Sequence, residues 1–431
     1  MKSILLVVAF GSLTSHAALP EKFDLRNTDG KSFVSSVKNQ KGGTCWTHAT
    51  MAGLESNLMM TGAWSQVETQ AQPNLAEYHL DWWNGFNDHW NPDSGSGGLT
   101  VHEGGDYRVA TAALSRKGAM RDSDAQSYKN PPQQTSPDYH TYYVRDVEWF
   151  DAGPNLENID GIKEALMNHG AMGTALHWAN SYYDSYSNTF YQSPQSSKDP
   201  NHAVAIVGWD DQKQTEAAKP GAWLIKNSWG PDWGDDGFFW ISYYDKVAGH
   251  HSEMGAVSFK NVELQKYQHI YSHDTHGWRD TKDNVFEAFN AFKAEGISGG
   301  PETLRAVSFY TTEDQSAYTI DIFGSFENGE LKHILTRSMG SQPRKGFHTV
   351  DLDFPISLEP GQTFYVAVTV SKGGHAFDRT SNVPVLLGSE GRITVPSVAH
   401  PGESFYKQNG QWVDLTTFNP SANFCIKALT N

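Results

Sequence analysis

The sequence predicts a mixed α+β domain followed by an all-β domain that folds as an antiparallel sandwich. In residues 18–263, helical patterns mix with strand-like apolar runs. In residues 264–431, short runs of alternating apolar and polar residues are separated by turn signals, a pattern typical of antiparallel strands. A chain of 431 residues is long enough for two or three domains.

Two helices and two strands stand out in the first domain. Residues 45–60 place small and apolar side chains on one broad face, and Thr61-Gly62 supplies a stop signal. Residues 158–168 carry apolar side chains at helical spacings. Strands are predicted for the apolar runs 203–209 and 223–226.

The second domain is predicted from side chains that alternate with a period of two. Val350, Leu352 and Phe354 alternate with polar residues, and residues 364–370 repeat the pattern. Further strands are predicted for residues 304–310, 318–323 and 423–429, with turns at 327–329 and 360–361.

Composition and charge exclude several classes of protein. With 38% hydrophobic and 19% charged residues, the chain has the composition of a globular protein. Its formal charge is −16 and it has no basic tract, so we expect no binding to nucleic acid or to anionic membranes.

The first 17 residues are predicted to be a signal peptide. Lys2 precedes the apolar run 4–13, and the small residues Ser15 and Ala17 suit cleavage before Ala18. The run is too short to span a bilayer and no later segment reaches spanning length, so no transmembrane segment is predicted. We expect an exported protein, periplasmic or secreted.

The chain contains only two cysteines, Cys45 and Cys425. Cys425 lies in the predicted terminal strand, where a buried small hydrophobe is its simplest interpretation. A disulfide between the two is possible from the count alone.

Three segments carry side chains suited to catalysis. Residues 37–46 form a Gly-rich loop that leads into the first helix, so the helix dipole favours the thiolate of Cys45. His202 leads into the strand 203–209, which would hold its ring rigidly. Asn227, in the segment 226–234, could orient that imidazole through its amide.

The order Cys, His, Asn resembles that of the papain-like cysteine peptidases. Residues 19–26 are similar to the start of a mature domain of that family, and the resemblance continues to about residue 245. His202 and Asn227 follow Cys45 by 157 and 182 residues, somewhat more than is usual. A Trp-rich and Gly/Ser-rich stretch at 80–100, predicted to be an inserted loop, would account for the difference.

The resemblance implies a role for each residue of a catalytic site. Cys45 would be the nucleophile and His202 its proton partner, as a thiolate–imidazolium pair. Asn227 would orient the imidazole and Trp229 would shield their hydrogen bond from water. Gln40, with the backbone N–H of Cys45, would form the oxyanion hole.

The resemblance also implies residues that support the substrate cleft. The paired glycines Gly104 and Gly105 lie where the family has such a pair along the cleft. Trp46, next to the nucleophile, is assigned to the same supporting group. Neither a metal nor a cofactor is implied.

The chain departs from the family pattern at three positions. Gln40 precedes Cys45 by five positions instead of six, and Gly42 replaces the cysteine of the usual loop disulfide. His48 replaces an aromatic residue one helical turn after Cys45, and we assign it a structural or pH-tuning role because the strand-mounted His202 fits the base better. Only 23 residues run from Ala18 to Gln40, too few for the family's helical pro-segment.

The second domain resembles the lectin-like domain that accompanies papain-like peptidases in some bacteria and archaea. That likeness implies sugar binding by analogy alone; the domain could instead cover the catalytic domain or position a substrate. The segments that carry the likeness are 267–274, 304–310, 400–405 and 422–427.

Other polar and aromatic clusters are predicted to be structural. His273, Asp274 and His276 lack the spacing of a known metal site, and the pair His250-His251 is expected to be exposed. The aromatic runs 81–84 and 182–186 are expected to pack inserted loops, with stacking on a sugar or a peptide as the alternative.

The sequence therefore predicts an exported cysteine peptidase with an accessory β-sandwich, acting on a peptide or protein. One alternative is a binding protein on the same scaffold, in which the shortened loop before Cys45 has abolished catalysis. Another is a transpeptidase or amidase that uses the same acyl-enzyme chemistry.

Overall fold

The computed structural model describes residues 18–93 and 97–431. The predicted signal peptide, residues 1–17, lies outside the described residues. The α-helices of the described chain are α1 (Cys45–Thr61), α2 (Glu77–Trp83), α3 (Tyr107–Lys117), α4 (Asp122–Ala125) and α5 (Ile159–His169). Short 3-10 helices are η1 (Trp64–Gln66), η2 (Asn180–Tyr182), η3 (Leu386–Gly388) and η4 (Leu415–Thr417).

The helix predicted at 45–60 is confirmed as α1, but its burial differs from the prediction. Gly62 adopts a left-handed conformation (φ 72°) and its N–H donates to the carbonyl of Met59, which ends the helix. Every residue from Cys45 to Leu58 is buried, so the prediction that only one face of this helix packs against the core is wrong. Strands and other helices enclose α1 on all sides.

Two other helical segments bear on the sequence predictions. The helix predicted at 158–168 is confirmed as α5, one residue further along. The stretch 80–100 was predicted to be a loop throughout, but residues 80–83 are the last part of α2.

The first half of the chain contributes ten strands among the described residues. They are β1 (Lys22–Asp24), β2 (Ala119–Met120), β3 (Thr141–Phe150), β4 (Met172–Leu176), β5 (Tyr183–Asp184), β6 (Thr189–Phe190), β7 (His202–Asp210), β8 (Ala222–Lys226), β9 (Phe238–Ser242) and β10 (Ala256–Leu264).

The second half is built from strands, as predicted. They are β11 (His269–Tyr271), β12 (Asp280–Asp283), β13 (Glu287–Lys293), β14 (Glu302–Thr311), β15 (Ser316–Glu327), β16 (Glu330–Gln342), β17 (Gly346–Leu358), β18 (Thr363–Val370), β19 (Gly374–Asp378), β20 (Ser381–Pro384), β21 (Arg392–Val395), β22 (Ser404–Gln408), β23 (Gln411–Asp414), β24 (Asn423–Phe424) and β25 (Lys427–Thr430).

The second half forms an antiparallel sandwich, which confirms the predicted fold class. Strands β11, β25, β14 and β17 lie on one side, and a six-stranded sheet in the order β16-β15-β18-β13-β22-β23 lies on the other. Alternate residues of β18, such as Phe364, Val366 and Val368, are fully buried between the two sheets.

The terminal strand predicted at 423–429 is two strands in different sheets. β24 pairs with β19, whereas β25 pairs with β11 and β14. Cys425 lies at the break between them and is buried and free, as is Cys45, so no disulfide joins the two.

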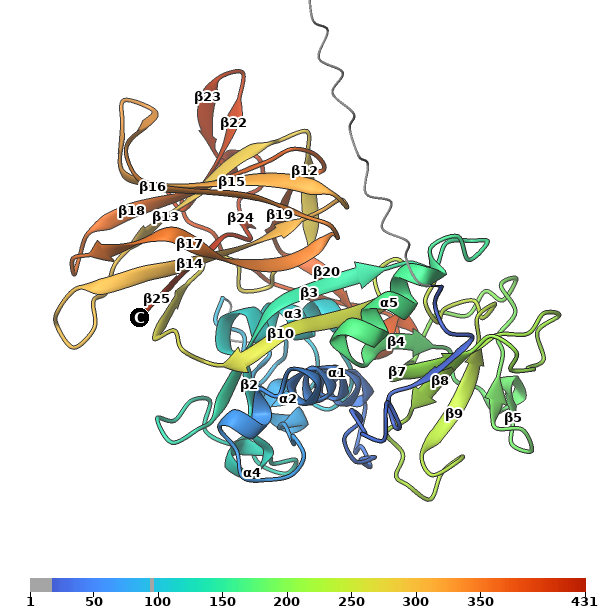
Figure 1. The fold of residues 1–431 in the computed structure, drawn as a ribbon. Coiled ribbons are helices and arrows are strands. Elements are labelled where there is room, and N and C mark those ends of the chain that lie inside the picture. The colour runs from blue at the N-terminus through green and yellow to red at the C-terminus, as the bar shows by residue number, and fades with distance from the viewer. Residues whose placement is uncertain (1–17, 94–96) are drawn as a thin grey trace, which may run out of the picture.

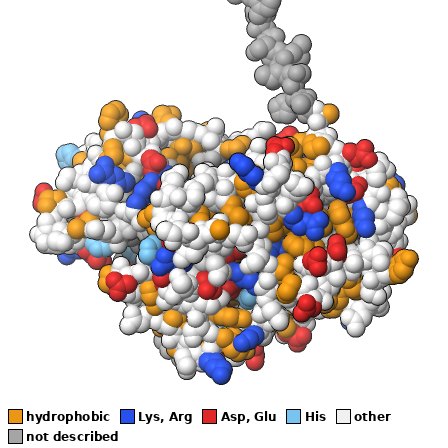
Figure 2. Space-filling model, turned by 60° about the horizontal axis from the view of Figure 1, so that its bottom comes forward, with side chains coloured by type: hydrophobic (Ala, Val, Ile, Leu, Met, Phe, Trp, Pro, Cys, Tyr) orange, Lys and Arg blue, Asp and Glu red, His pale blue; other side chains and the backbone are white. Residues whose placement is uncertain are grey.

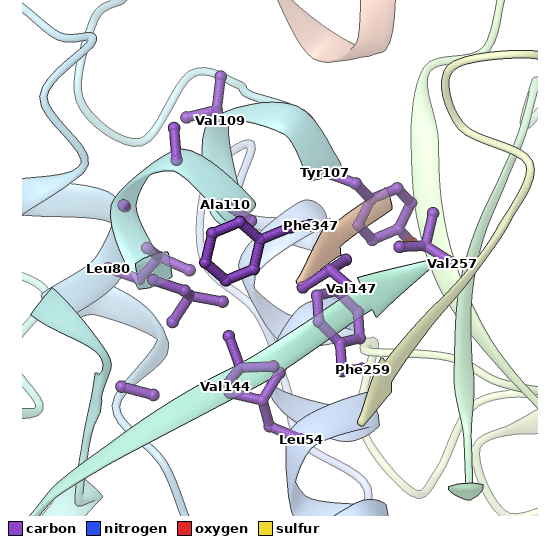
Figure 3. Packing of buried hydrophobic residues seen from close by; sticks show 14 of the residues in the cluster. Leu54, Leu80, Tyr107, Val109, Ala110, Val144, Val147, Val257, Phe259 and Phe347 are labelled. Atoms are coloured by element: carbon purple, nitrogen blue, oxygen red, sulfur yellow. The ribbon is translucent and has the colours of Figure 1, made fainter. Parts of the chain in front are cut away.

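One sheet runs through both halves of the molecule (Figure 1). Strand β17 of the sandwich pairs with β3 of the first half, with Phe347 opposite Val147 and His348 opposite Asp146. Figure 3 shows Phe347 near Ala110 and Val147, in a buried cluster that also contains Leu54 and Phe259. The two halves therefore share a sheet and a hydrophobic core.

The surface agrees with the low charge density of the sequence. On the face shown in Figure 2, basic side chains occur singly or in small groups among acidic ones. Within the described ranges, no helix is long and apolar enough to cross a membrane.

Candidate active site

Cys45 is the first residue of α1 and is 2% exposed. The loop before it is held close to the segment at 102–105, because the N–H of Gly43 donates to the carbonyl of His102 at 2.6 Å. Gly42 has φ +67°, and a Cβ atom there would lie 2.6 Å from that same carbonyl. The glycines of the predicted loop are therefore required by this close approach.

His202 and Asn227 come together at the ends of two adjacent strands. His202 begins β7 and Asn227 follows the last residue of β8, and these strands are antiparallel neighbours. The Nε2 of His202 and the Oδ1 of Asn227 are 2.8 Å apart. Since an amide oxygen only accepts, Nε2 carries the proton, which directs the lone pair of Nδ1 to the other side of the ring.

Trp229 covers the imidazole and its bond to Asn227. Its ring stacks on His202 with centroids 4.5 Å apart and an interplanar angle of 20°. Trp178 packs edge-on against Trp229 at 4.8 Å and extends this aromatic wall. His202 is 4% exposed and Asn227 is 2% exposed, so water is largely excluded from their hydrogen bond.

Burial favours the neutral forms of Cys45 and His202. Burial raises the pKa of the Cys45 thiol to about 11, although a hydrogen bond with the backbone of Ala203 acts in the opposite direction. Burial also lowers the pKa of His202 to about 4, although the bond to Asn227 acts in the opposite direction. Among the described residues, the thiol of Cys45 forms no hydrogen bond with His202, so the ion pair implied by the sequence stays a prediction.

Gln40 connects the loop before Cys45 to the strand that carries Asn227. Its Oε1 accepts from the hydroxyl of Ser228 at 2.6 Å, and its Nε2 donates to the carbonyl of Gly42 at 2.9 Å. Its backbone N–H donates to the carbonyl of Ser228 at 2.8 Å. In the shortened loop, bonds at both ends of its amide therefore anchor Gln40 between Ser228 and Gly42.

Gly104 and Gly105, which the resemblance assigns to the substrate cleft, are both closely packed. A Cβ atom on Gly105 would lie 2.5 Å from the indole of Trp46, which is fully buried beneath it. A Cβ atom on Gly104 would collide with the backbone nitrogen of Leu386, in the loop between β20 and β21. Gly105 therefore packs against Trp46, and Gly104 lies against a loop of the second half of the chain.

His48 is engaged away from Asn227, in keeping with the structural role predicted for it. Its Nδ1 donates to the carbonyl of Thr44 at 2.8 Å, one turn earlier in α1. Burial lowers its pKa, which favours a neutral ring.

A buried ionic network lies directly behind the site, and the sequence reasoning missed it. Lys38 pairs with Glu55 at 2.8 Å and also with Glu77. Ser35 donates to Glu55 at 2.5 Å and accepts from Lys226 at 2.9 Å. The signal available in the sequence was Glu55, the one carboxylate of this helix.

The polar clusters set aside in the sequence separate into unrelated contacts. His273 donates to the carbonyl of Ala291 at 2.8 Å, and Asp274 pairs with the buried Lys427. His250 and His251 are half-buried instead of exposed.

The two aromatic runs differ in environment. The indoles of Trp82 and Trp83 donate to backbone carbonyls of the 127–132 segment, as expected for loop packing. Tyr183 stacks on Trp233, whereas Tyr186 is 98% exposed.

A helix that presents a cysteine, packed against a sheet that presents a histidine and an asparagine, defines the class of papain-fold proteins. The family description "Papain family cysteine protease" matches residues 19–258, and the chain belongs to this family. The description "Lectin like domain" matches residues 270–430.

Two curated relatives each match about half of this chain. Pro-cathepsin H of Bos taurus is 30% identical over 224 residues, which are 50% of this chain and 58% of the relative. Procathepsin L of Rattus norvegicus is 29% identical over 52% of this chain and 60% of its own. The chain thus spans less than two thirds of the length of these relatives.

One solved structure matches both halves together. The clostridial cysteine protease Cwp84, after propeptide cleavage, is 25% identical, with a TM-score of 0.72 over 93% of this chain and 97% of its own. A second structure, of the cysteine protease and lectin-like domains of Cwp84, a surface layer associated protein of Clostridium difficile, has the same TM-score at 24% identity.

Proposed function

We propose that this protein is an exported cysteine peptidase that hydrolyses peptide bonds through Cys45, His202 and Asn227. The observation that carries the proposal is the 2.8 Å bond between His202 and Asn227, beneath Trp229 and beside the N-terminus of the helix that presents Cys45. Membership of the papain family supports it.

The proposed reaction begins when His202 takes the proton of the Cys45 thiol. The thiolate attacks the carbonyl carbon of the substrate, and Gln40 Nε2 and the backbone N–H of Cys45 donate to the oxyanion that forms. The imidazolium then gives its proton to the leaving amine as the C–N bond breaks. Water, deprotonated by His202, attacks the thioester and releases the acid and the thiol.

Asn227 acts here as a positioning residue. Its Oδ1 holds Nε2–H of His202, which leaves Nδ1 free to receive the proton. Trp229 keeps water from competing for that bond, as burial of both partners requires.

The test compares the two cysteines of the chain. We expect Cys45→Ala to lower kcat/KM on a protein substrate by at least about 10³-fold, with unchanged circular dichroism. Cys425→Ala, which removes a buried thiol of the sandwich, is the matched control and should keep its activity. Equal activity in Cys45→Ala and wild type would contradict the assignment.

Product analysis separates hydrolysis from the related reactions. In the proposed reaction mass spectrometry finds only carboxylic acid and amine products, with 18O entering the acid from labelled water. A transpeptidase gives new amide products when an amine is present, and an amidase acts on side-chain or terminal amides alone.

We also propose that the lectin-like half, from about residue 264, binds a carbohydrate. A groove on its six-stranded sheet is lined by Trp412 beside the ion pairs Arg337–Asp321 and Lys407–Glu287. An indole next to charged hydrogen-bonding groups suits the face and hydroxyls of a sugar. The test is binding of the Cys45→Ala chain to a glycan array, and we expect Trp412→Ala to abolish this binding. A binding protein without catalysis would bind glycans in the same way, but its wild-type chain would cleave no peptide.

Export is the remaining part of the proposal. The predicted leader would be removed before Ala18. The protein recovered outside the cytoplasm should therefore have the intact mass of a chain that begins at Ala18. A product that retains Met1 would contradict the predicted cleavage.

A further inference from the structure

Three candidate metal ligands converge where the loop after α2 meets the sandwich. Asp93 comes from that loop, His276 from the turn before β12, and Asp378 from the end of β19. Their ligand atoms all lie within 4.8 Å of one another. His276 and Asp378 are completely buried, and the side chain of Asp93 is 12% exposed.

The imidazole of His276 is oriented with a free lone pair toward the two carboxylates. Its Nε2 donates to the carbonyl of Gly85 at 2.9 Å, which in the neutral ring leaves the lone pair on Nδ1. Nδ1 has no hydrogen-bond partner in the described chain and lies 3.9 Å from Asp93 Oδ2. A histidine that binds a metal through one nitrogen and donates the other to a backbone carbonyl has this arrangement.

The two carboxylates have no cationic partner at contact distance. Neutral donors bind both carboxylates. Asp93 accepts from the hydroxyls of Thr275 and Ser397 and the N–H of Val398. Asp378 accepts from the hydroxyl of Ser397 and the N–H groups of His276 and Asn423. Among the described residues, neither lysine nor arginine forms an ion pair with Asp93 or Asp378. The nearby Arg116 donates to the backbone carbonyls of Asn84 and Ala112 instead.

We propose that Asp93, His276 and Asp378 bind one divalent transition-metal ion, with zinc and manganese as the best candidates. One imidazole and two carboxylates favour these ions over calcium or magnesium, which prefer all-oxygen sites. A divalent ion balances the two carboxylates and accepts the unused lone pair of Nδ1. Because its ligands come from both halves of the chain, the ion fastens the sandwich to the papain-like half.

The test measures metal directly, in the Cys45→Ala chain so that the thiol does not take up the ion. The protein is stripped with EDTA, titrated with Zn²⁺ or Mn²⁺, and analysed by inductively coupled plasma mass spectrometry and by thermal unfolding. We expect one ion per chain and a rise in Tm. Both are lost in His276→Gln and kept in the control His400→Gln, which changes an exposed histidine.

A second variant, Asp93→Asn, keeps the proposal testable if His276→Gln does not fold. Its amide oxygen still accepts from Ser397, and the position is at the partly exposed edge of the site. We expect this variant to bind at least about tenfold more weakly, since it removes one anionic ligand. The proposal is overturned if the wild-type site takes up neither ion, or if folded Asp93→Asn binds as tightly as wild type. In that case a proton on Asp378, in place of a metal ion, would reduce the negative charge of the site. Burial and the neighbouring Asp274 both raise the pKa of Asp378.

A second, independent observation concerns the loop between β20 and β21. Its 3-10 turn, Leu386–Gly388, lies against β7, the strand that begins with His202. The side chain of Leu386 lies 2.8 Å from where a Cβ atom on Gly43 would be, and its backbone nitrogen crowds Gly104. The turn thus lies between the two loops that flank Cys45.

The conformation of this turn is strained. Leu386 and Leu387 both have positive φ, 41° and 60°, a region that leucine rarely adopts. Leu387 is 3% exposed and belongs to the same core cluster as Cys45 and Ala203. Packing against the site therefore holds a backbone that would relax if the turn were released.

We infer that this turn is an autoinhibitory contact, which a peptide substrate must displace to reach Cys45. The inference rests on the proposed peptidase function. It also gives a reason for the burial of Cys45 and His202, since a displaced turn would expose both to solvent and substrate.

Two reagents of different size test the contact. A peptidyl epoxide needs the cleft, whereas iodoacetamide needs only the thiol. We expect the double variant Leu386→Gly with Leu387→Gly to react with the epoxide at Cys45 about tenfold faster than wild type, as displacement of a dominant closed state requires. The control, Ile334→Gly with Leu335→Gly on exposed positions of β16, should react at the wild-type rate.

The outcomes separate the two proposals. If the epoxide labels Cys45 equally fast in wild type and the double variant, the contact is not inhibitory, while the peptidase function stands. If neither protein reacts with the epoxide although iodoacetamide labels Cys45, the peptidase function fails and the inhibitory contact fails with it.

Discussion

At the scale of single residues, the site is made of polar side chains that are buried and paired. The imidazole of His202 has one nitrogen fixed by Asn227 and one face covered by Trp229. Behind them, Lys38 lies between Glu55 and Glu77 in a region from which water is excluded. In such surroundings a lost partner cannot be replaced by solvent, so single substitutions have large effects.

Asn227→Ala should impair catalysis more than folding. Without Oδ1 the imidazole can rotate, and a misplacement of about 1 Å lowers a rate by about 10²-fold. We therefore expect kcat/KM to fall by about 10²-fold while KM changes little. Steady-state kinetics on a peptide substrate measures this, with Asn155→Ala at an exposed position as control; an unchanged kcat would exclude a positioning role.

Glu55→Ala should affect folding instead. The change removes one of the two carboxylates that pair with Lys38. It also removes the negative charge of Glu55 that acts on the buried Lys226, whose pKa burial already lowers to about 8. Removing one partner of a buried pair costs about 3–5 kcal/mol. Urea unfolding measures the loss, Glu216→Ala on the surface is the control, and equal stability of the two variants would refute this account.

At the scale of elements, two segments hold the molecule together. Helix α1 is buried along most of its length and presents Cys45 at its first residue. Strand β17 crosses from the sandwich into the first sheet and inserts Phe347 into its core (Figure 3). The contact between the halves is therefore continuous in hydrogen bonds as well as in apolar packing.

Gly346→Ala tests the pairing of β17 with β3. A Cβ atom on Gly346 would collide with the backbone carbonyl of Val147. Overpacking of this kind costs about 1–3 kcal/mol. We expect a lower urea midpoint and unfolding that separates into two steps. Gly300→Ala, where the nearest atom is 3.6 Å from the new Cβ, is the matched control, and identical midpoints would contradict the prediction.

At the scale of the whole molecule, buried histidines make stability depend on pH. Burial lowers the pKa of His79, His202 and His375 to about 4, from an ordinary value of 6.5. Between pH 6.5 and 4 the unfolded chain binds protons at these residues that the folded chain does not. The free energy of unfolding therefore falls as the pH falls through this window.

Urea midpoints at several pH values between 7.5 and 5 measure this loss. His375→Gln removes one of the buried rings without touching the site, so its stability should depend less steeply on pH than that of wild type. The exposed His400→Gln should retain the full dependence. A wild-type midpoint that stays constant down to pH 5 would show that these rings are not held neutral.

The sequence by itself determined the order of the two domains, the class of each and the segments that form the site. Those properties follow from local patterns: glycines before a helix, an apolar run after a histidine, and alternation with a period of two. It identified Cys45 at a helix start and His202 at a strand start because both positions are fixed by nearest neighbours in the chain.

Only the tertiary structure decided how the two halves meet. Three contacts join residues far apart in the chain: the pairing of β17 with β3, the packing of Leu386 against Gly43 and Gly104, and the meeting of Asp93 with His276 and Asp378. Local patterns do not specify such contacts, because each segment is compatible with many partners. Burial is likewise a property of the whole fold, so its effects on the pKa of Cys45 and of His202 could not be read from the neighbouring residues in the sequence.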